Sequence, residues 1–254
     1  MIRCHVRTAF LGALLALAVG CSQNADPVLY CGAGIRPPVS EIAEEFGRRH
    51  GITVECDYAG SEVLMSRIKL TDRGDLYMPG DVHYVELAEK EGLVTSKQTV
   101  CYFVPVIMVR KGNPKDIHTL ADLAKPGIKI GLGDPEACAI GRKALKIFEK
   151  NNIPQADIDR NVAFRSVTVN ELGNHIKLDT LDAVIVWDAV AAYFPDDGEI
   201  VPIPREQNII STVAIGTLKS TENPELAAKF VEFITSDEGK AVFKRHHYAT
   251  TLPD

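Results

Sequence analysis

The sequence lacks the motifs that identify the common catalytic sites. It contains no GxSxG turn of a serine hydrolase, no GxxxxGK[ST] phosphate loop and no HExxH zinc helix. A GxG occurs at Gly32 and Gly34, but Pro37 occupies the position of the third glycine of a dinucleotide-binding turn. We therefore expect a protein that is not an enzyme and that needs no cofactor.

The cysteines and histidines do not have the spacing of a metal site. Beyond residue 21, four cysteines are widely separated, and none lies within a helical turn of a histidine: Cys31, Cys56, Cys101 and Cys138. The sequence leaves open whether they are free and buried or form disulfides, for which three full pairings exist. We expect the adjacent His246 and His247 to lie on the surface. An exported enzyme or redox protein that uses the four cysteines remains the least favoured alternative.

Two glycine-containing turns are suited to binding an anion through the backbone. The apolar residues 28–31 lead into Gly32 and Gly34, and residues 52–58 lead into Gly60 and Ser61. Each turn joins a predicted strand to a predicted helix, and ligands of open α/β sheets bind at such turns. The unpaired N–H groups and the dipole of an exposed helix N-terminus favour an anion by about 0.3 to 1 kcal/mol. Asp134 and Glu136 would repel an anion, so we expect them to shape their own loop.

The order of elements that holds these turns predicts two α/β lobes. Strands at residues 28–31, 52–58 and 76–78 alternate with helices from Pro37, Ser61 and Asp81, and a second series follows with strands at residues 128–132 and 183–187. Helices are predicted from residue 141 to 150, over residues 169–178, from Pro224 and after Ser236. Long apolar strands at residues 100–109 and 209–217 would cross between the lobes, with the ligand cleft between them. We expect one lobe to comprise residues 28–104 with 210–254 and the other residues 105–209.

The first 21 residues are typical of a secretion signal. Arg3 and Arg7 precede an apolar stretch at residues 9–20, which is too short to span a bilayer. A signal that ends in small residues before Cys21 resembles the lipobox of bacterial lipoproteins, although Ala18 is smaller than the usual aliphatic residue. We expect lipidation of Cys21, a linker at residues 22–27, and a location at the periplasmic or cell-surface side of a membrane. The alternative is a plain cleaved signal with an incidental cysteine.

Composition excludes several other classes of protein. The chain has 254 residues, a net charge of −6, 46% hydrophobic and 24% charged residues, as expected for a folded protein of one or two domains. No long apolar run occurs beyond the N-terminus, so a polytopic membrane protein is excluded. The acidic balance and the scattered lysines and arginines argue against nucleic acid as a partner. We expect a monomer that binds its ligand at a local site.

Five segments, in this order and spacing, resemble the periplasmic molybdate- and tungstate-binding proteins of ABC importers. They are residues 29–34 (LYCGAG), 58–61 (YAGS), 74–77 (GDLY), 133–136 (GDPE) with Gly141, and 183–187 (AVIVW). The resemblance extends over nearly the whole mature chain, and the GDPE loop is its most specific part. It implies the type II periplasmic binding fold, with two mostly parallel sheets flanked by helices and joined by two crossing strands.

The resemblance also implies a ligand-binding set. The family holds a tetrahedral oxyanion with side-chain hydroxyls and backbone N–H groups from both lobes. Ser61 corresponds to the family's serine at the second strand–helix turn, and Ile140 and Val169 correspond to backbone donors at helix N-termini. Trp187 occupies a position where a tyrosine is common.

The first turn departs from the family pattern. Gly34 occupies a position where a serine is common, so one hydroxyl donor is missing, and Arg36 is a candidate replacement. The resemblance implies a lipid-anchored binding protein that captures molybdate or tungstate and delivers it to the permease of an ABC importer. The alternatives are another anion, such as sulfate or phosphate, or a ferric ion bound by tyrosines such as Tyr193.

Overall fold

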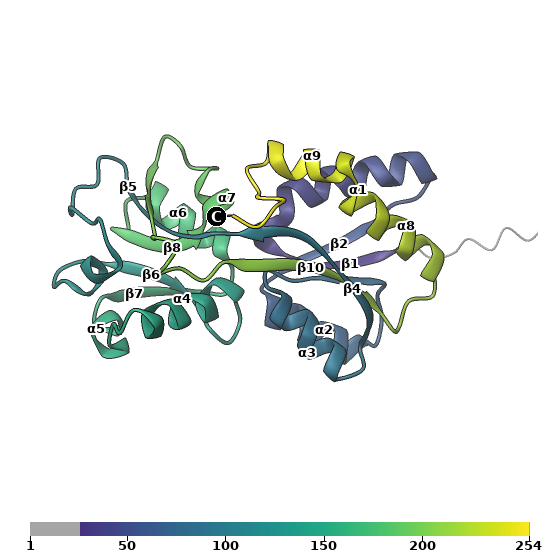
Figure 1. Cartoon of the computed structure of the whole chain (residues 1–254), viewed down its shortest axis with the longest axis horizontal. Coiled ribbons are helices and arrows are strands. Elements are labelled where there is room, and N and C mark those ends of the chain that lie inside the picture. The colour runs from purple at the N-terminus through teal and green to yellow at the C-terminus, as the bar shows by residue number, and fades with distance from the viewer. Residues whose placement is uncertain (1–25, 254) are drawn as a thin grey trace, which may run out of the picture.

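A computed structural model describes residues 26–253 and shows two α/β lobes side by side (Figure 1). The predicted signal and Cys21 lie outside the described residues. Each lobe is built on a five-stranded sheet, with strand orders β2-β1-β3-β10-β4 and β7-β6-β8-β5-β9. Among residues 26–253, no helix is both long enough and apolar enough to cross a membrane.

The first lobe is built from the chain up to Phe103 and from the chain after the second crossing. Its strands are β1 (Val28–Gly32), β2 (Glu55–Ala59), β3 (Leu76–Met78), β4 (Val94–Phe103) and β10 (Ser211–Leu218). Its helices are the 3-10 turn η1 (Ala33–Ile35), α1 (Arg36–His50), α2 (Ser61–Thr71), α3 (Val82–Lys90), α8 (Pro224–Thr235) and α9 (Asp237–Arg245). Figure 1 shows α1, α8 and α9 on one face of the sheet and α2 and α3 on the other.

The second lobe has the same layered organisation. Its strands are β5 (Pro105–Arg110), β6 (Ile130–Gly133), β7 (Val162–Ser166), β8 (Ala183–Trp187) and β9 (Gly198–Pro202). Its helices are the 3-10 turn η2 (Leu120–Ala124), α4 (Ala139–Lys150), α5 (Gln155–Asp159), α6 (Val169–Lys177) and α7 (Asp188–Ala191). All five residues of the central strand β8 are buried, as expected for an apolar strand with helices on both faces.

Parallel strands carry the connections that build the site. In the first lobe β1 pairs in parallel with β2 and β3, and in the second β6 pairs in parallel with β7 and β8. Because each of these strands is followed by a loop and a helix, their carboxyl ends and the helix N-termini lie at the same edge of each sheet.

The chain crosses between the lobes at two places that hydrogen bonds tie to their surroundings. At the first crossing, Val104 exchanges two hydrogen bonds with Asp188, of 2.8 Å through the Asp188 N–H and 3.2 Å through its carboxylate. At the second, the side chain of Asn208 donates to the carbonyl of Pro105 at 2.8 Å. The two crossing segments are therefore joined to each other.

The single strand predicted at residues 100–109 is wrong. β4 ends at Phe103 and pairs with β10, whereas β5 begins at Pro105 and pairs with β8 and β9 in the other sheet. Pro105 has no N–H to continue a hydrogen-bond ladder, and the chain changes sheets there. The second crossing strand begins at Ser211, two residues later than predicted. The predicted lobe boundaries, residues 28–104 with 210–254 and residues 105–209, stay a prediction.

Asn208 offers a test of the join between the crossings. It is 2% exposed, donates to Pro105 and accepts from the N–H of Ile209 at 2.8 Å. Asn208→Ala leaves these buried groups unpaired, so we expect the free energy of unfolding to fall by about 1–3 kcal/mol in urea denaturation. Asn174→Ala, at an exposed position of α6, is the matched control and should unfold like the wild type. Equal stability of the two variants would contradict this role.

Candidate functional site

A small cavity lies between the two lobes, at the edges where the parallel strands end. Its volume is about 20 Å³. It is lined from the first lobe by Gly32, Ala33, Gly34, Ala59, Gly60, Ser61, Gly80 and Phe103, and from the second by Cys138, Ala139, Thr168, Val169 and Trp187. None of these side chains is an acid, a basic group or a histidine. Three larger hollows, of about 320 to 500 Å³, are each lined by the first lobe alone.

The N-termini of four helical segments converge on this cavity. Ala33 opens the 3-10 turn that leads into α1, Ser61 is the first residue of α2, Ala139 the first of α4, and Val169 the first of α6. The first N–H groups of a helix have no partner within the helix and carry its partial positive charge. The cavity is therefore electropositive without containing a charged side chain.

Ser61 lies at the cavity with its hydroxyl group positioned by its own lobe. It is 3% exposed, and its Oγ accepts a hydrogen bond of 3.1 Å from the N–H of Gly80. The hydroxyl of Tyr77 donates to the Ser61 carbonyl at 2.8 Å. Gly60 is the N-cap of α2, and Ser61 is already helical. Because Ser61 Oγ is the acceptor in its bond with Gly80, its O–H can still donate to a ligand.

The two lobes touch through backbone atoms at Gly60. A Cβ placed on Gly60 would lie 2.4 Å from the carbonyl oxygen of Ala137 and 2.5 Å from that of Val167, both in the second lobe. The N–H of Glu62 also points to the Ala137 carbonyl, at 3.4 Å. Only glycine permits this approach, because carbonyl oxygens of the main chain cannot move aside as a flexible side chain would.

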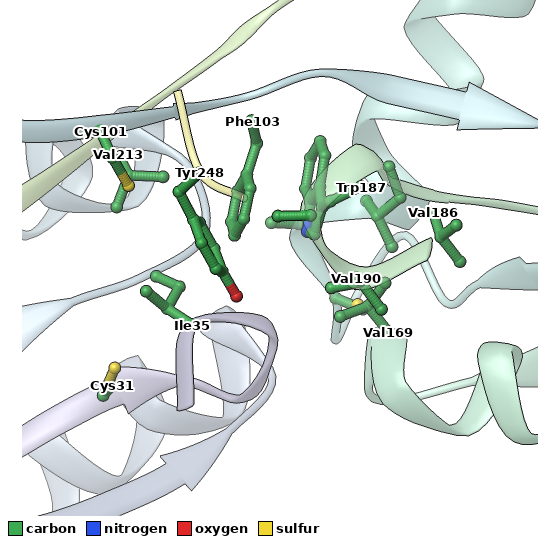
Figure 2. Packing of buried hydrophobic residues seen from close by; sticks show 14 of the residues in the cluster. Cys31, Ile35, Cys101, Phe103, Val169, Val186, Trp187, Val190, Val213 and Tyr248 are labelled. Carbon is green, nitrogen blue, oxygen red and sulfur yellow. The ribbon is translucent and has the colours of Figure 1, made fainter. Parts of the chain in front are cut away.

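Gly34 and Trp187 fit each other across the cavity. A Cβ on Gly34 would lie 2.7 Å from Cγ1 of Val169 and 3.3 Å from Cδ1 of Trp187. The indole is 2% exposed and stacks on Phe103, with ring centroids 4.6 Å apart and planes 3° from parallel (Figure 2). A side chain at 34 would therefore collide with Val169 and press more lightly on the indole of Trp187.

Arg36 and Ile140 are not among the lining residues. The Arg36 side chain is exposed, and its guanidinium carbon lies 4.6 Å from the centre of the Tyr58 ring. Ile140 is fully buried one residue inside α4, next to Cys138 and Ala139, which do line the cavity. Of the six residues predicted to bind ligand, the structure brings together Gly34, Ser61, Val169 and Trp187.

Tyr248 supports the first turn and was not predicted from the sequence. Its hydroxyl donates to the carbonyl of Gly34, and its ring centroid lies 5.4 Å from that of Phe103. A bridge between Tyr102 and Ala249 holds the C-terminal segment in place. Gly34 and Tyr248 are 214 residues apart in the chain, so no local pattern could have indicated this contact.

Thr168 lines the cavity and was not among the residues predicted to bind ligand. It is the N-cap of α6, although its side chain makes no capping bond. A threonine directly before an amphipathic helix is a recognised helix-start signal, and Thr168 carries that signal in the sequence.

His247 is exposed, as expected, whereas His246 at the surface is partly covered. His246 is half-buried, with Nδ1 3.2 Å from the hydroxyl of Tyr193 and Nε2 2.9 Å from a carboxylate oxygen of Glu41. The hydrogen bond from His246 is the main cause that lowers the pKa of Glu41. This contact joins the second lobe to α1 and holds Tyr193 outside the cavity lining.

The four cysteines beyond residue 21 carry free thiols. Burial raises the pKa of Cys31 and Cys101 well above the ordinary value, and it raises the pKa of Cys138, at the cavity, to about 11. A thiol that stays protonated at neutral pH is a poor nucleophile. These environments do not favour cysteine-dependent catalysis.

The chain matches the bacterial extracellular solute-binding protein family over residues 27–249. A putative binding protein of Haemophilus influenzae is 30% identical over 221 residues, which cover 87% of this chain and 89% of that relative. The molybdate-binding protein ModA of Mycobacterium tuberculosis is 25% identical, over 87% of this chain and 84% of its own length.

A solved structure shares the fold. The sulfate-binding protein SubI of Mycobacterium tuberculosis superimposes with a TM-score of 0.78 over 91% of this chain and 88% of that chain, at 19% identity. Together with the two helix-flanked sheets and the two crossings, this confirms the fold class expected from the sequence, the type II periplasmic binding fold.

The raised pKa of Cys138 predicts how the thiol reacts. With a pKa of about 11, about one thiol in a thousand is ionised at pH 8. Alkylation of Cys138 by iodoacetamide in the native protein should therefore be slow, and should accelerate about tenfold per pH unit between pH 8 and 10. Mass spectrometry of the modified peptide measures the rate, and the urea-denatured chain serves as control. A rise of only about two- to fourfold from pH 8.5 to 10 would show a thiol of ordinary pKa.

Proposed function

The chain belongs to the bacterial extracellular solute-binding protein family, and we propose that this member captures a small tetrahedral oxyanion, molybdate or tungstate, between its lobes and delivers it to the permease of an ABC importer. The lining of the cavity carries the proposal. It combines the N-termini of four helical segments from both lobes with no charged side chain. Such a lining attracts negative charge through fixed dipoles, which an overall acidic chain does not prevent.

The same lining argues against a ferric ion as the ligand. A cation needs carboxylate, phenolate or imidazole ligands, and the cavity presents none. Within residues 26–253 no group of three or more histidine, cysteine, aspartate or glutamate side chains is arranged to hold a metal. Tyr193 is bonded to His246 and lies outside the lining. An anion held by donors suits these residues better.

The donors also bear on which anion binds. Hydrogen phosphate keeps a proton near neutral pH, and that proton needs an acceptor, for which the lining offers no carboxylate. Molybdate, tungstate and sulfate are fully ionised, so every oxygen can accept. The small volume of the cavity favours a compact inorganic anion over a phosphorylated sugar. The molybdate-binding relative supports molybdate, and the sulfate-binding structure of the same fold makes sulfate the second candidate.

Hydrogen bonds to the ligand's charge account for tight binding. Each is worth about 1.5–3 kcal/mol, so six or seven would exceed the costs of desolvation and lobe closure and still leave submicromolar affinity. Candidate donors are the Ser61 hydroxyl, the Trp187 indole N–H and the first backbone N–H groups of α2, α4 and α6. Arg36 reaches the ligand only if its side chain leaves the Tyr58 ring, and Ile140 only through its backbone.

A lipid anchor would keep the protein close to the permease that it serves. Lipidation of Cys21 would tether the protein as a monomer to the outer side of the cytoplasmic membrane or to the cell surface, with residues 22–27 as the linker. Mass spectrometry of the membrane fraction tests the anchor directly. A mature N-terminus elsewhere would reject the anchor.

Calorimetry and tryptophan fluorescence test the ligand and the site. We expect molybdate or tungstate to bind at least tenfold more tightly than sulfate, a difference of about 1.4 kcal/mol, and to change the fluorescence of Trp187, the only tryptophan. Ser61→Ala removes one donor and should weaken binding by about 1–3 kcal/mol, with unchanged unliganded stability. Ser66→Ala, at an exposed position of the same helix, should bind like the wild type. Equal affinity for all three anions would reject the assignment.

The fit between Gly34 and the second lobe predicts a rescue experiment. Gly34→Ala places a methyl group 2.7 Å from Val169 Cγ1 and should hold the lobes apart, which weakens molybdate binding at least tenfold. Adding Val169→Ala removes that atom and should restore most of the affinity. Gly60→Ala meets main-chain oxygens instead, and no substitution of a neighbouring side chain should restore its binding. If the Gly34→Ala and Val169→Ala double variant binds no better than Gly34→Ala, steric exclusion is not the cause.

A further inference from the structure

A buried ion pair joins the two lobes. The ammonium group of Lys143, on α4 in the second lobe, lies 2.5 Å from a carboxylate oxygen of Asp81, which follows β3 in the first lobe. Only 12% and 10% of the two side chains are exposed. Because the partners come from different lobes, the pair exists only while the lobes are together.

Asp81 is held firmly by its own lobe. Its Oδ1 accepts from the N–H of His83 at 2.9 Å, which caps α3. Its Oδ2 lies within hydrogen-bond distance of the hydroxyl of Ser211, the first residue of β10 after the second crossing. Lys143 therefore contacts a carboxylate that is already oriented.

The same hydrogen bonds connect the ion pair to the cavity. The Ser211 hydroxyl can donate to Asp81 or, at 3.0 Å, to the carbonyl of Gly80. Gly80 lines the cavity, and its N–H donates to Ser61 Oγ. The ion pair, the second crossing and a wall of the cavity thus form one hydrogen-bonded group.

We propose that Lys143 is a positioning residue that sets ligand affinity by pairing with Asp81 when the lobes close, and that the pair slows opening and ligand release. The inference rests on the proposed function, because it assumes that closure traps the ligand. A contact made only in the closed form shifts the equilibrium toward that form and raises the apparent affinity. Lys143 lies outside the cavity lining and was not among the residues predicted from the sequence.

The charges around Asp81 leave Lys143 as its main partner. Burial raises the pKa of the Asp81 carboxyl, but the Lys143 ammonium and the bonds from Ser211 and His83 outweigh this and hold the pKa below its ordinary value. Burial, helped by the charges of Arg142 and Lys146, lowers the pKa of His83, although Asp81 and Glu86 act in the opposite direction. Tyr84 on α3 stays protonated, because burial raises its pKa to about 12. The carboxylate is therefore ionised at neutral pH, and a His83 pKa below its ordinary 6.5 leaves the imidazole mostly neutral above that pH.

Lys143→Met tests the inference, because methionine keeps the length of the side chain and removes its charge. At pH 8 we expect molybdate to dissociate at least tenfold faster, with an unchanged association rate, in stopped-flow experiments that follow Trp187 fluorescence. Lys146→Met, at an exposed position on the same helix, is the control and should match the wild type.

The pH dependence separates a charge effect from a loss of packing. Without Lys143 the buried Asp81 carboxylate has no counter-charge, so its pKa rises, and affinity should recover as the pH falls from 8.5 to 6. In the wild type Asp81 stays ionised over this range and contributes no such recovery. The double variant Lys143→Met with Asp81→Asn should bind more tightly than Lys143→Met and show no recovery with pH.

The outcomes distinguish this inference from the function on which it rests. If the wild type binds molybdate and Lys143→Met releases it at the wild-type rate, the inference alone is overturned. An equal loss in Lys146→Met, or a loss in Lys143→Met that does not vary with pH, would also overturn it. If the wild type binds no tetrahedral oxyanion, the proposed function fails and the inference fails with it.

Discussion

The positive ends of four helical segments face one small cavity, and the rest of the structure depends on this electrostatic constraint. The starts of α2, α4 and α6 and of the turn into α1 come from both lobes, so bringing the lobes together brings like partial charges together. No lining side chain supplies a compensating negative charge. Under the proposed function, a bound anion offsets this repulsion and accepts hydrogen bonds from both lobes at once. The shift of the equilibrium toward the closed form is then limited by how much more tightly the anion binds that form than the open one.

The lining combines very small residues with rigid aromatic ones, and this combination limits what can bind. Gly60 allows main-chain contact between the lobes, and Gly34 leaves space for the indole of Trp187. That indole stacks on Phe103, and Tyr248 packs beside Phe103 (Figure 2). Buried rings at close-packed density cannot shift to admit a larger ligand without loss of packing. Selection by size therefore depends on the aromatic wall, and selection by charge depends on the helix ends.

Local sequence patterns predicted the central elements and missed those that depend on distant partners. The apolar runs of β1 and β8 are evident because both strands are buried in the middle of their sheets. The strands β7 and β9 were missed because they are half-exposed edge strands of mixed composition. The helix α7 has only four residues, which is too few to show the helical repeat of apolar side chains. The apolar segment on both sides of Val104 was predicted as one strand because β4 and β5 are both largely buried there. The two strands nevertheless belong to different sheets. Within the site, the start of α4 at Ala139 decides which backbone groups face the cavity, and a sequence pattern does not fix such a boundary to one residue.

The ion pair between the lobes has to remain weak for the protein to work as a receptor. A contact that closed the lobes without ligand would hide the helix ends and slow capture. Burying the charges of Lys143 and Asp81 costs solvation that nearly offsets their attraction, so an intact pair contributes little net stability, whereas a broken one leaves a costly unpaired charge. The intact pair therefore adds only a modest preference for the closed form, and losing one partner costs more than the pair itself contributes. The like partial charges of the helix ends also oppose closure, and under the proposed function a bound anion removes that opposition.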